Sequence, residues 1–289
     1  MPVTALVSAK SCGVTTSALA LTLASKRPSL LAECDPAGGT LRAGFLQGEV
    51  GAGQGLYHLA AAERTGPEAL AGAFASHLWP LDEAGHRKLL PGLTDPGQAG
   101  ALSRTWPMLS EVLHVMAEEA GHDIFIDAGR VALESGRLHT SLTPAPLLHQ
   151  ADLVLLVVRG TEQSLTLARH IIEPLRTELA EHGSGMDALG LLLIEEGPAR
   201  AHQVADALKT PVLGALPFEP AVGGFFTNGG RPPRGYARSG LLRHARTATE
   251  QLEAAASRRR IQQQYPARTG SVQISGMLQR LAERGGRRG

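Results

Sequence analysis

Val3-Thr-Ala-Leu-Val-Ser8, followed directly by Ala9-Lys-Ser-Cys-Gly-Val-Thr-Thr16, is the stretch that decides the fold. The first part is a short apolar run and predicts a buried strand. The second part is rich in Gly, Ser and Thr, and it leads into an Ala- and Leu-rich helix predicted over residues 16–26. A loop between a strand and a helix N-terminus presents backbone N–H groups to an anion. The stretch therefore predicts a phosphate-binding loop.

Apolar runs alternate with helical patterns along the rest of the chain, and this alternation is typical of a parallel sheet wound with helices. The further predicted strands cover residues 29–34, 123–127, 152–158, 189–194 and 211–215. The further predicted helices cover residues 108–119, 162–180, 199–208 and 241–260. The strands are apolar without alternation, as expected where both faces of a sheet are covered. We predict an α/β domain over residues 1–256, with a doubly wound, mostly parallel sheet flanked by helices.

Residues 257–289 form a basic tail on an acidic body. They contain eight Arg and one acidic residue, Glu283, which gives the tail +7 and leaves the body at −6 in a chain of net charge +1. Little periodicity over residues 262–276 predicts a linker, and residues 275–284 predict a short amphipathic helix. Its apolar stripe consists of Met277, Leu278 and Leu281. The tail is expected to contact a membrane surface or DNA weakly, or else to be solvated without a partner.

Composition excludes several classes of protein. The N-terminus has no basic segment and no long apolar segment, so a signal peptide is not expected, and no run approaches the roughly 20 apolar residues of a membrane span. Two cysteines are too few for a disulfide-stapled scaffold. The histidines lack metal-ligand spacing, and the Gly-x-Ser-x-Gly pattern of serine hydrolases is missing. We expect a cytoplasmic protein, peripheral at a membrane or nucleoid if its tail binds there.

The loop over residues 8–17 resembles the deviant Walker A loop of the MinD/ParA family, Lys-Gly-Gly-x-Gly-Lys-Thr-Thr. Aligned on its end, Gly13, Thr15 and Thr16 match the family's second-half glycine and its two threonines. The resemblance implies that ATP or ADP binds with Mg²⁺, and that Thr15 is a ligand of the metal. The residues implied in nucleotide binding are Lys10, Ser11, Cys12, Gly13, Val14, Thr15 and Thr16.

Both lysines of the family motif are missing. Val14 stands where the Walker lysine belongs and Ala9 where the signature lysine belongs, while Lys10 is one place away. In the family the Walker lysine neutralises phosphate charge, and the signature lysine reaches across a homodimer. By analogy with oxyanion donors, losing such a group costs about 2.7–4 kcal/mol, or roughly 10²–10³ in rate. The degenerate Walker A loop therefore predicts a pseudo-ATPase or a very slow ATPase.

The resemblance continues beyond the loop. On the family pattern, Asp35 is the inherited catalytic position that orients the attacking water, and Glu33 replaces the preceding aspartate. Asp127, at the end of a Walker B-like strand, would act on Mg²⁺ through water. Residues 213–217 would flank the base, and Glu195 and Glu196 stand where the family often has an asparagine that recognises adenine. The alternative for both aspartates is a role in a turn.

Within the family, the likeness is to members with irregular phosphate loops, such as the TadZ/CpaE-type proteins that place pilus-assembly machinery. The resemblance implies a homodimeric positioning or scaffolding protein that binds nucleotide weakly or not at all. It would recruit protein partners of a localisation, secretion or pilus system to a pole, membrane or nucleoid. One alternative is an active ATPase that uses a substitute basic residue such as Lys10 or Arg130. Another is a nucleotide-independent DNA-binding partition protein that uses its basic tail.

Overall fold

The structure, a computed structural model, describes residues 1–264. The chain divides into a compact unit, Met1–Ala256, and a second unit that begins at Ser257. The predicted start of the linker, residue 262, is wrong, because helix α9 (Gly240–Gln264) continues through Gln264. The residues up to that point are helix formers, and the first proline comes two positions later. The predicted amphipathic helix over residues 275–284 lies outside the described residues, so its role with a membrane or DNA stays a prediction.

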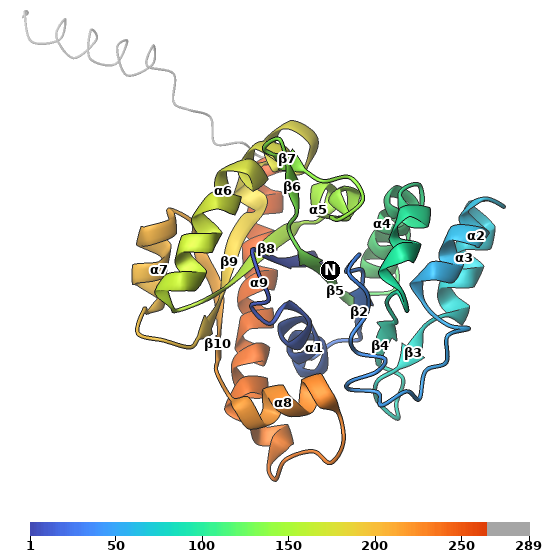
Figure 1. Cartoon of the computed structure of the whole chain (residues 1–289), viewed down its shortest axis with the longest axis horizontal. Coiled ribbons are helices and arrows are strands. Elements are labelled where there is room, and N and C mark those ends of the chain that lie inside the picture. The colour runs from blue at the N-terminus through green and yellow to red at the C-terminus, as the bar shows by residue number, and fades with distance from the viewer. Residues whose placement is uncertain (265–289) are drawn as a thin grey trace, which may run out of the picture. The chain divides into compact units, whose positions relative to one another are not determined.

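A single sheet of eight strands forms the centre of the first unit, in the order β10-β9-β8-β1-β5-β2-β4-β3 (Figure 1). In chain order its strands are β1 (Val3–Ser8), β2 (Ser29–Glu33), β3 (Trp79–Pro80), β4 (Arg87–Leu90), β5 (Asp123–Arg130), β8 (Leu153–Arg159), β9 (Leu189–Glu195) and β10 (Val212–Pro217). All neighbouring strands pair in parallel except β3 and β4. A short antiparallel pair, β6 (Leu133–Glu134) with β7 (Arg137–Leu138), follows β5. The predicted mostly parallel sheet is confirmed.

Helices cover both faces of this sheet. One face packs on α2 (Leu59–Glu63), α3 (Pro67–Ser76), α4 (Thr105–Glu118), α5 (Ala145–Gln150), α6 (Glu162–His182) and α7 (Ala201–Leu208). The other face packs on α1 (Val14–Ala24), α8 (Pro220–Asn228) and α9. Within β1, Val7 joins the first core and Leu6 the second. Both faces are therefore buried, which is why the strands read as continuous apolar runs.

The elements that the sequence analysis missed are short. They include the ten-residue α3, the five-residue α2, the nine-residue α8 and the two-residue β3. Such segments span too few turns or alternations for their hydrophobic periodicity to stand out. The long elements are present within a few residues of their predicted bounds; α1, for example, begins at Val14 instead of residue 16. Within residues 1–264, no helix combines the length and apolar character needed to cross a membrane.

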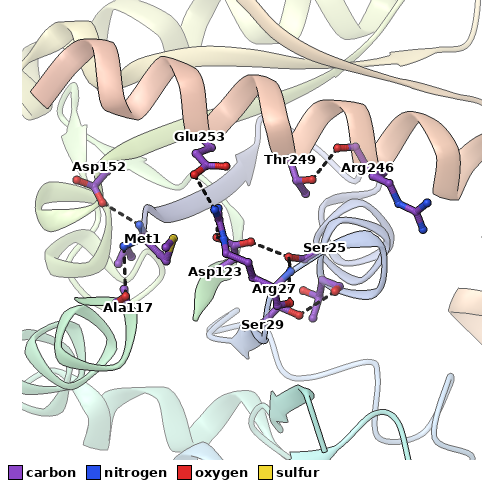
Figure 2. A network of polar contacts seen from close by, with 12 residues as sticks. Met1, Ser25, Arg27, Ser29, Ala117, Asp123, Asp152, Arg246, Thr249 and Glu253 are labelled. Carbon is purple, nitrogen blue, oxygen red and sulfur yellow. Dashed lines mark hydrogen bonds and ion pairs between the residues drawn. The ribbon is translucent and has the colours of Figure 1, made fainter. Parts of the chain in front are cut away.

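A polar network ties the N-terminal edge of the sheet together (Figure 2). Arg27 Nη2 lies 2.9 Å from Asp123 Oδ1, and Arg27 Nη1 lies 2.6 Å from Glu253 Oε1. Ser25 Oγ donates a hydrogen bond to Asp123 Oδ2 at 2.6 Å. Glu253 is the largest cause that raises the pKa of Arg27, and Arg27 in turn lowers the pKa of Glu253. The loop after α1, the start of β5 and helix α9 are thus joined by ion pairs that share Arg27.

Candidate nucleotide site

The loop between β1 and α1 has the geometry of an anion cradle. It leaves β1 at Ser8 and turns at Gly13, whose φ of 91° is a left-handed conformation that glycine adopts without steric cost. Helix α1 begins at the next residue, and no side chain of the described residues caps its first turn. The backbone N–H groups at the start of α1 are therefore available to an anion, as the sequence predicts.

Side chains of the loop point to different surroundings. Val14 is 6% exposed and packs in the core beneath α1. Val14 is not among the described residues that line the two pockets beside the loop. Lys10 and Ser11 are exposed instead. Val14, which the sequence analysis aligns with the Walker lysine, thus has a side chain that belongs to the core, and only its backbone can face a phosphate.

Thr15 and Asp127 meet across the loop. Thr15 Oγ1 donates a hydrogen bond of 2.5 Å to Asp127 Oδ2, and Gly129 N donates one of 3.0 Å to Asp127 Oδ1. Asp127 is fully buried, and burial raises its pKa to about 7, helped by the nearby negative charge of Glu33 and Asp35 and opposed by the Thr15 hydroxyl. The two residues predicted to act on Mg²⁺ are therefore in contact.

These two residues fit a magnesium ion only together with a phosphate. Among the described residues, no group of three or more His, Cys, Asp and Glu side chains is arranged to hold a metal ion. Mg²⁺, however, keeps several waters and commonly takes one or two protein oxygens beside substrate phosphates. Thr15 Oγ1 would supply such an oxygen, and Asp127 would act on the ion through water. When bound, the ion would neutralise charge on the phosphates and on Asp127.

Asp35 lies on the loop that follows β2, next to the end of β5. Its Oδ1 accepts a hydrogen bond of 2.8 Å from Ala37 N, so the predicted turn role is present. Burial raises its pKa, opposed by the Ala37 N–H and by the positive charge of Arg130. A Cβ at Gly129 would lie 2.2 Å from Asp35 Cγ. The carboxyl of Asp35 therefore packs directly against the backbone that follows Asp127.

Glu33 accepts hydrogen bonds from the backbone of two loops. Its Oε1 accepts hydrogen bonds from Thr40 N at 2.7 Å and Leu41 N at 2.9 Å, and its Oε2 accepts one from Gly92 N at 2.8 Å. The side chain is buried, and burial raises its pKa against the effect of these three bonds. Glu33 thus anchors the loop after β2 to the loop after β4. The sequence analysis assigned it only as a substitute for an aspartate.

A pocket of about 310 Å³ lies beside the loop and reaches the ends of β9 and β10. The loop contributes Cys12, Gly13 and Thr16, and the apolar wall includes Leu216 and Pro217. Its size is at the lower end of the range for small-molecule sites, which are mostly apolar with a few polar groups. The pocket includes part of the segment, residues 213–217, that the sequence analysis places beside a base.

A second pocket, of about 320 Å³, shares Cys12 and Arg159 with the first and is also lined by Lys10. Arg159 ends β8, and its Nη1 lies 2.6 Å from Glu196 Oε2. The Arg159 guanidinium carbon also lies 5.9 Å from the ring centroid of Phe218. The sequence analysis considered Glu196 but missed Arg159. The available signal was an arginine directly after the uninterrupted apolar run of β8.

No protein family and no curated protein sequence matches this chain. Solved structures do match it. The septum site-determining protein MinD from Pyrococcus horikoshii, complexed with Mg-ADP, is 18% identical, with a TM-score of 0.62 over 89% of this chain and 98% of that one. The MinD cell division protein of Aquifex aeolicus is 19% identical, with a TM-score of 0.61 over 88% and 98%.

A ParA family ATPase from Chlorobium tepidum is 16% identical, with a TM-score of 0.59 over 86% of this chain and 98% of that chain. The match covers almost all of each neighbour and most of this chain. The chain has the fold of the MinD and ParA ATPases.

Proposed function

We propose that this protein is a positioning or scaffolding subunit whose degenerate phosphate loop binds ATP or ADP with Mg²⁺ weakly or not at all, and hydrolyses little or none. The observation that carries the proposal is the burial of Val14 in the core at the position of the Walker lysine. The loop backbone and the Thr15–Asp127 pair support binding of a nucleotide. The missing cation removes stabilisation of the transition state for phosphoryl transfer.

The Mg-ADP bound to the neighbour from Pyrococcus horikoshii supports the same cofactor class here. A scaffold of this kind would act as a homodimer and would recruit a protein partner of a localisation, secretion or pilus system. The place of recruitment would be a pole, a membrane or the nucleoid. Nucleotide would then set the dimer state, because a ligand shifts an equilibrium toward the state that it binds better.

Calorimetric titration with ATP–Mg²⁺ and ADP–Mg²⁺, with phosphate release measured on the same sample, tests the proposal. We expect weak or no binding and release close to background. Rapid phosphate release by the unaltered protein would overturn the proposal.

An active ATPase is the second candidate, and the observation in its favour is the positive charge of Arg130 acting on Asp35. This cation is the last residue of β5, three positions after Asp127. In an active enzyme, Asp35→Ala would abolish phosphate release and Arg130→Met would lower it. In a scaffold, both variants would leave release at the same background level as the unaltered protein.

A further inference from the structure

We propose that Arg159 is the residue that binds the anionic part of a ligand at the phosphate loop, and that Glu196 competes for it. Ligand binding would exchange the Arg159–Glu196 ion pair for an Arg159–phosphate ion pair. The inference rests on the proposed function for the location of the site. It is stated for any phosphorylated ligand, however, and it assigns to Arg159 the charge that Val14 does not supply.

The place of Arg159 follows from strand order. β8 pairs in parallel with β1, with Val157 opposite Ser8, so the end of β8 lies beside the loop that leaves β1. Arg159 lines the first pocket together with Gly13 and Thr16 of that loop. Among the described residues that line this pocket, it is the only basic one. Of the alternatives considered from the sequence, Lys10 lines the second pocket only.

The hydrogen-bonding state of Arg159 leaves room for an anion. Its Nη1 is bonded to Glu196 at 2.6 Å, while its Nε is buried and has no hydrogen-bond partner among the described residues. A buried donor without an acceptor is unusual in a folded protein and suggests a missing partner. Guanidinium presents its N–H groups as a planar fork that suits a phosphate, and Phe218 packs against that fork.

Without a ligand, Glu196 would keep Arg159 in the Arg159–Glu196 ion pair. The carboxylate and the guanidinium are each about one-third exposed, at 30% and 34%, so their pairing can exchange with a ligand from solvent. A phosphate oxygen would compete with the Glu196 carboxylate for the same N–H groups. Part of the binding free energy would therefore be used to break the existing ion pair. This competition, in addition to the missing lysines, would keep affinity low in the unaltered protein.

The test is calorimetric titration with inorganic pyrophosphate of the whole chain and of variants. Glu196→Gln should tighten binding by about tenfold, and Arg159→Met should weaken it by about tenfold or more, as for one charged hydrogen bond. Arg159→Lys, which keeps the charge without the fork, should fall between Arg159→Met and the unaltered protein. Lys26→Met and Arg169→Met, which remove exposed cations that line neither pocket, are matched controls and should change affinity by less than about twofold. Thermal unfolding checks that each variant is folded.

Equal pyrophosphate affinity in Glu196→Gln, Arg159→Met and the unaltered protein would overturn the inference, as would no binding by the folded Glu196→Gln variant. Titration of the same proteins with ADP–Mg²⁺, together with phosphate release from ATP–Mg²⁺, separates the two proposals. If pyrophosphate follows the expected order and the unaltered protein releases phosphate rapidly, Arg159 keeps its assignment and the proposed function fails. If ADP binds all of them alike, the proposed function stands and Arg159 loses its role.

Discussion

Strand β5 carries a buried aspartate at each end of the sheet, and the two have opposite surroundings. At the N-terminal edge, Asp123 accepts hydrogen bonds from Arg27 and Ser25, and Arg27 reaches on to Glu253 (Figure 2). At the C-terminal edge, Asp127 accepts hydrogen bonds only from neutral donors among the described residues, and burial raises its pKa to about 7. The strand and the residue type are the same; only the partners differ.

The difference shows which end of the sheet serves stability. A buried carboxylate with a guanidinium partner stays charged and joins elements that lie far apart in the chain. Burying an ionised carboxylate without a cation beside it costs free energy, and this cost is removed when the carboxylate takes up a proton or binds a cation. Perturbed groups of this kind gather at functional sites. The N-terminal edge therefore holds the fold together, and the C-terminal edge keeps charge available for a ligand.

Arg27→Met should have the largest effect, because it leaves the Asp123 carboxylate buried without its cation. We expect the free energy of unfolding to fall by about 3–5 kcal/mol, the usual loss when one partner of a buried pair is removed. Urea denaturation at neutral pH measures it. Lys26→Met is the matched control, since the neighbouring Lys26–Glu250 pair is exposed and should contribute less than about 1 kcal/mol. Equal losses in the two variants would remove the contrast between buried and exposed pairs.

The pH dependence of stability tests the other end of β5. The folded pKa of Asp127, about 7, lies above the unfolded value of about 3.9. Between these values the unfolded chain has released the proton that the folded protein still holds. The free energy of unfolding should therefore fall as pH rises from about 4 to about 7, by roughly 3 kcal/mol, and level off above 7.

Asp127→Asn should lack this component, because the amide does not titrate in this range and still accepts the Thr15 hydrogen bond. Urea denaturation of both proteins at several pH values between 4.5 and 8 measures the difference. Identical pH profiles for the two proteins would show that the buried carboxyl does not differ in protonation between the folded and unfolded states.

Gly129→Ala sharpens the comparison by moving the second acid, Asp35. The φ of Gly129, 68°, is left-handed, and the added Cβ would lie 2.2 Å from Asp35 Cγ. Backbone strain and the collision together should lower the free energy of unfolding by about 2 kcal/mol. Gly121→Ala is the matched control, with the same φ of 68° and no atom within 4 Å of the added Cβ. A loss no greater than in the control would show that Asp35 moves away freely.

Thr15→Val should have the smallest effect, about 1 kcal/mol, as for one neutral hydrogen bond. Because the Thr15 hydroxyl lowers the pKa of Asp127, its removal should shift the upper end of the pH-dependent range to higher pH. The pH series of urea denaturations used for Asp127→Asn measures this shift. Thr16→Val is the control, since it leaves both hydrogen bonds of Asp127 in place. A downward shift in Thr15→Val would contradict the assigned role of the hydroxyl.

Local patterns predicted the long elements and the loop well, and they predicted partners poorly. The apolar runs of β1 and β8 and the loop that ends at Gly13 are visible without the structure, because burial on both faces and turn geometry restrict the types of neighbouring residues. Glu33 shows the limit. Its acceptor role depends on Gly92, which is 59 residues away, and no local pattern connects the two.

The sequence by itself determined a mostly parallel α/β sheet with a strand-to-helix loop after β1, and with aspartates after β2 and within β5 at the edge that the C-terminal ends of parallel strands share. Only the tertiary structure decided that β8 lies beside β1, which places Arg159 at the loop, and that Arg27 meets Glu253, 226 residues away. The physical reason is that hydrophobic periodicity is a property of neighbouring residues. Strand order and long-range ion pairs result instead from the packing of the whole chain.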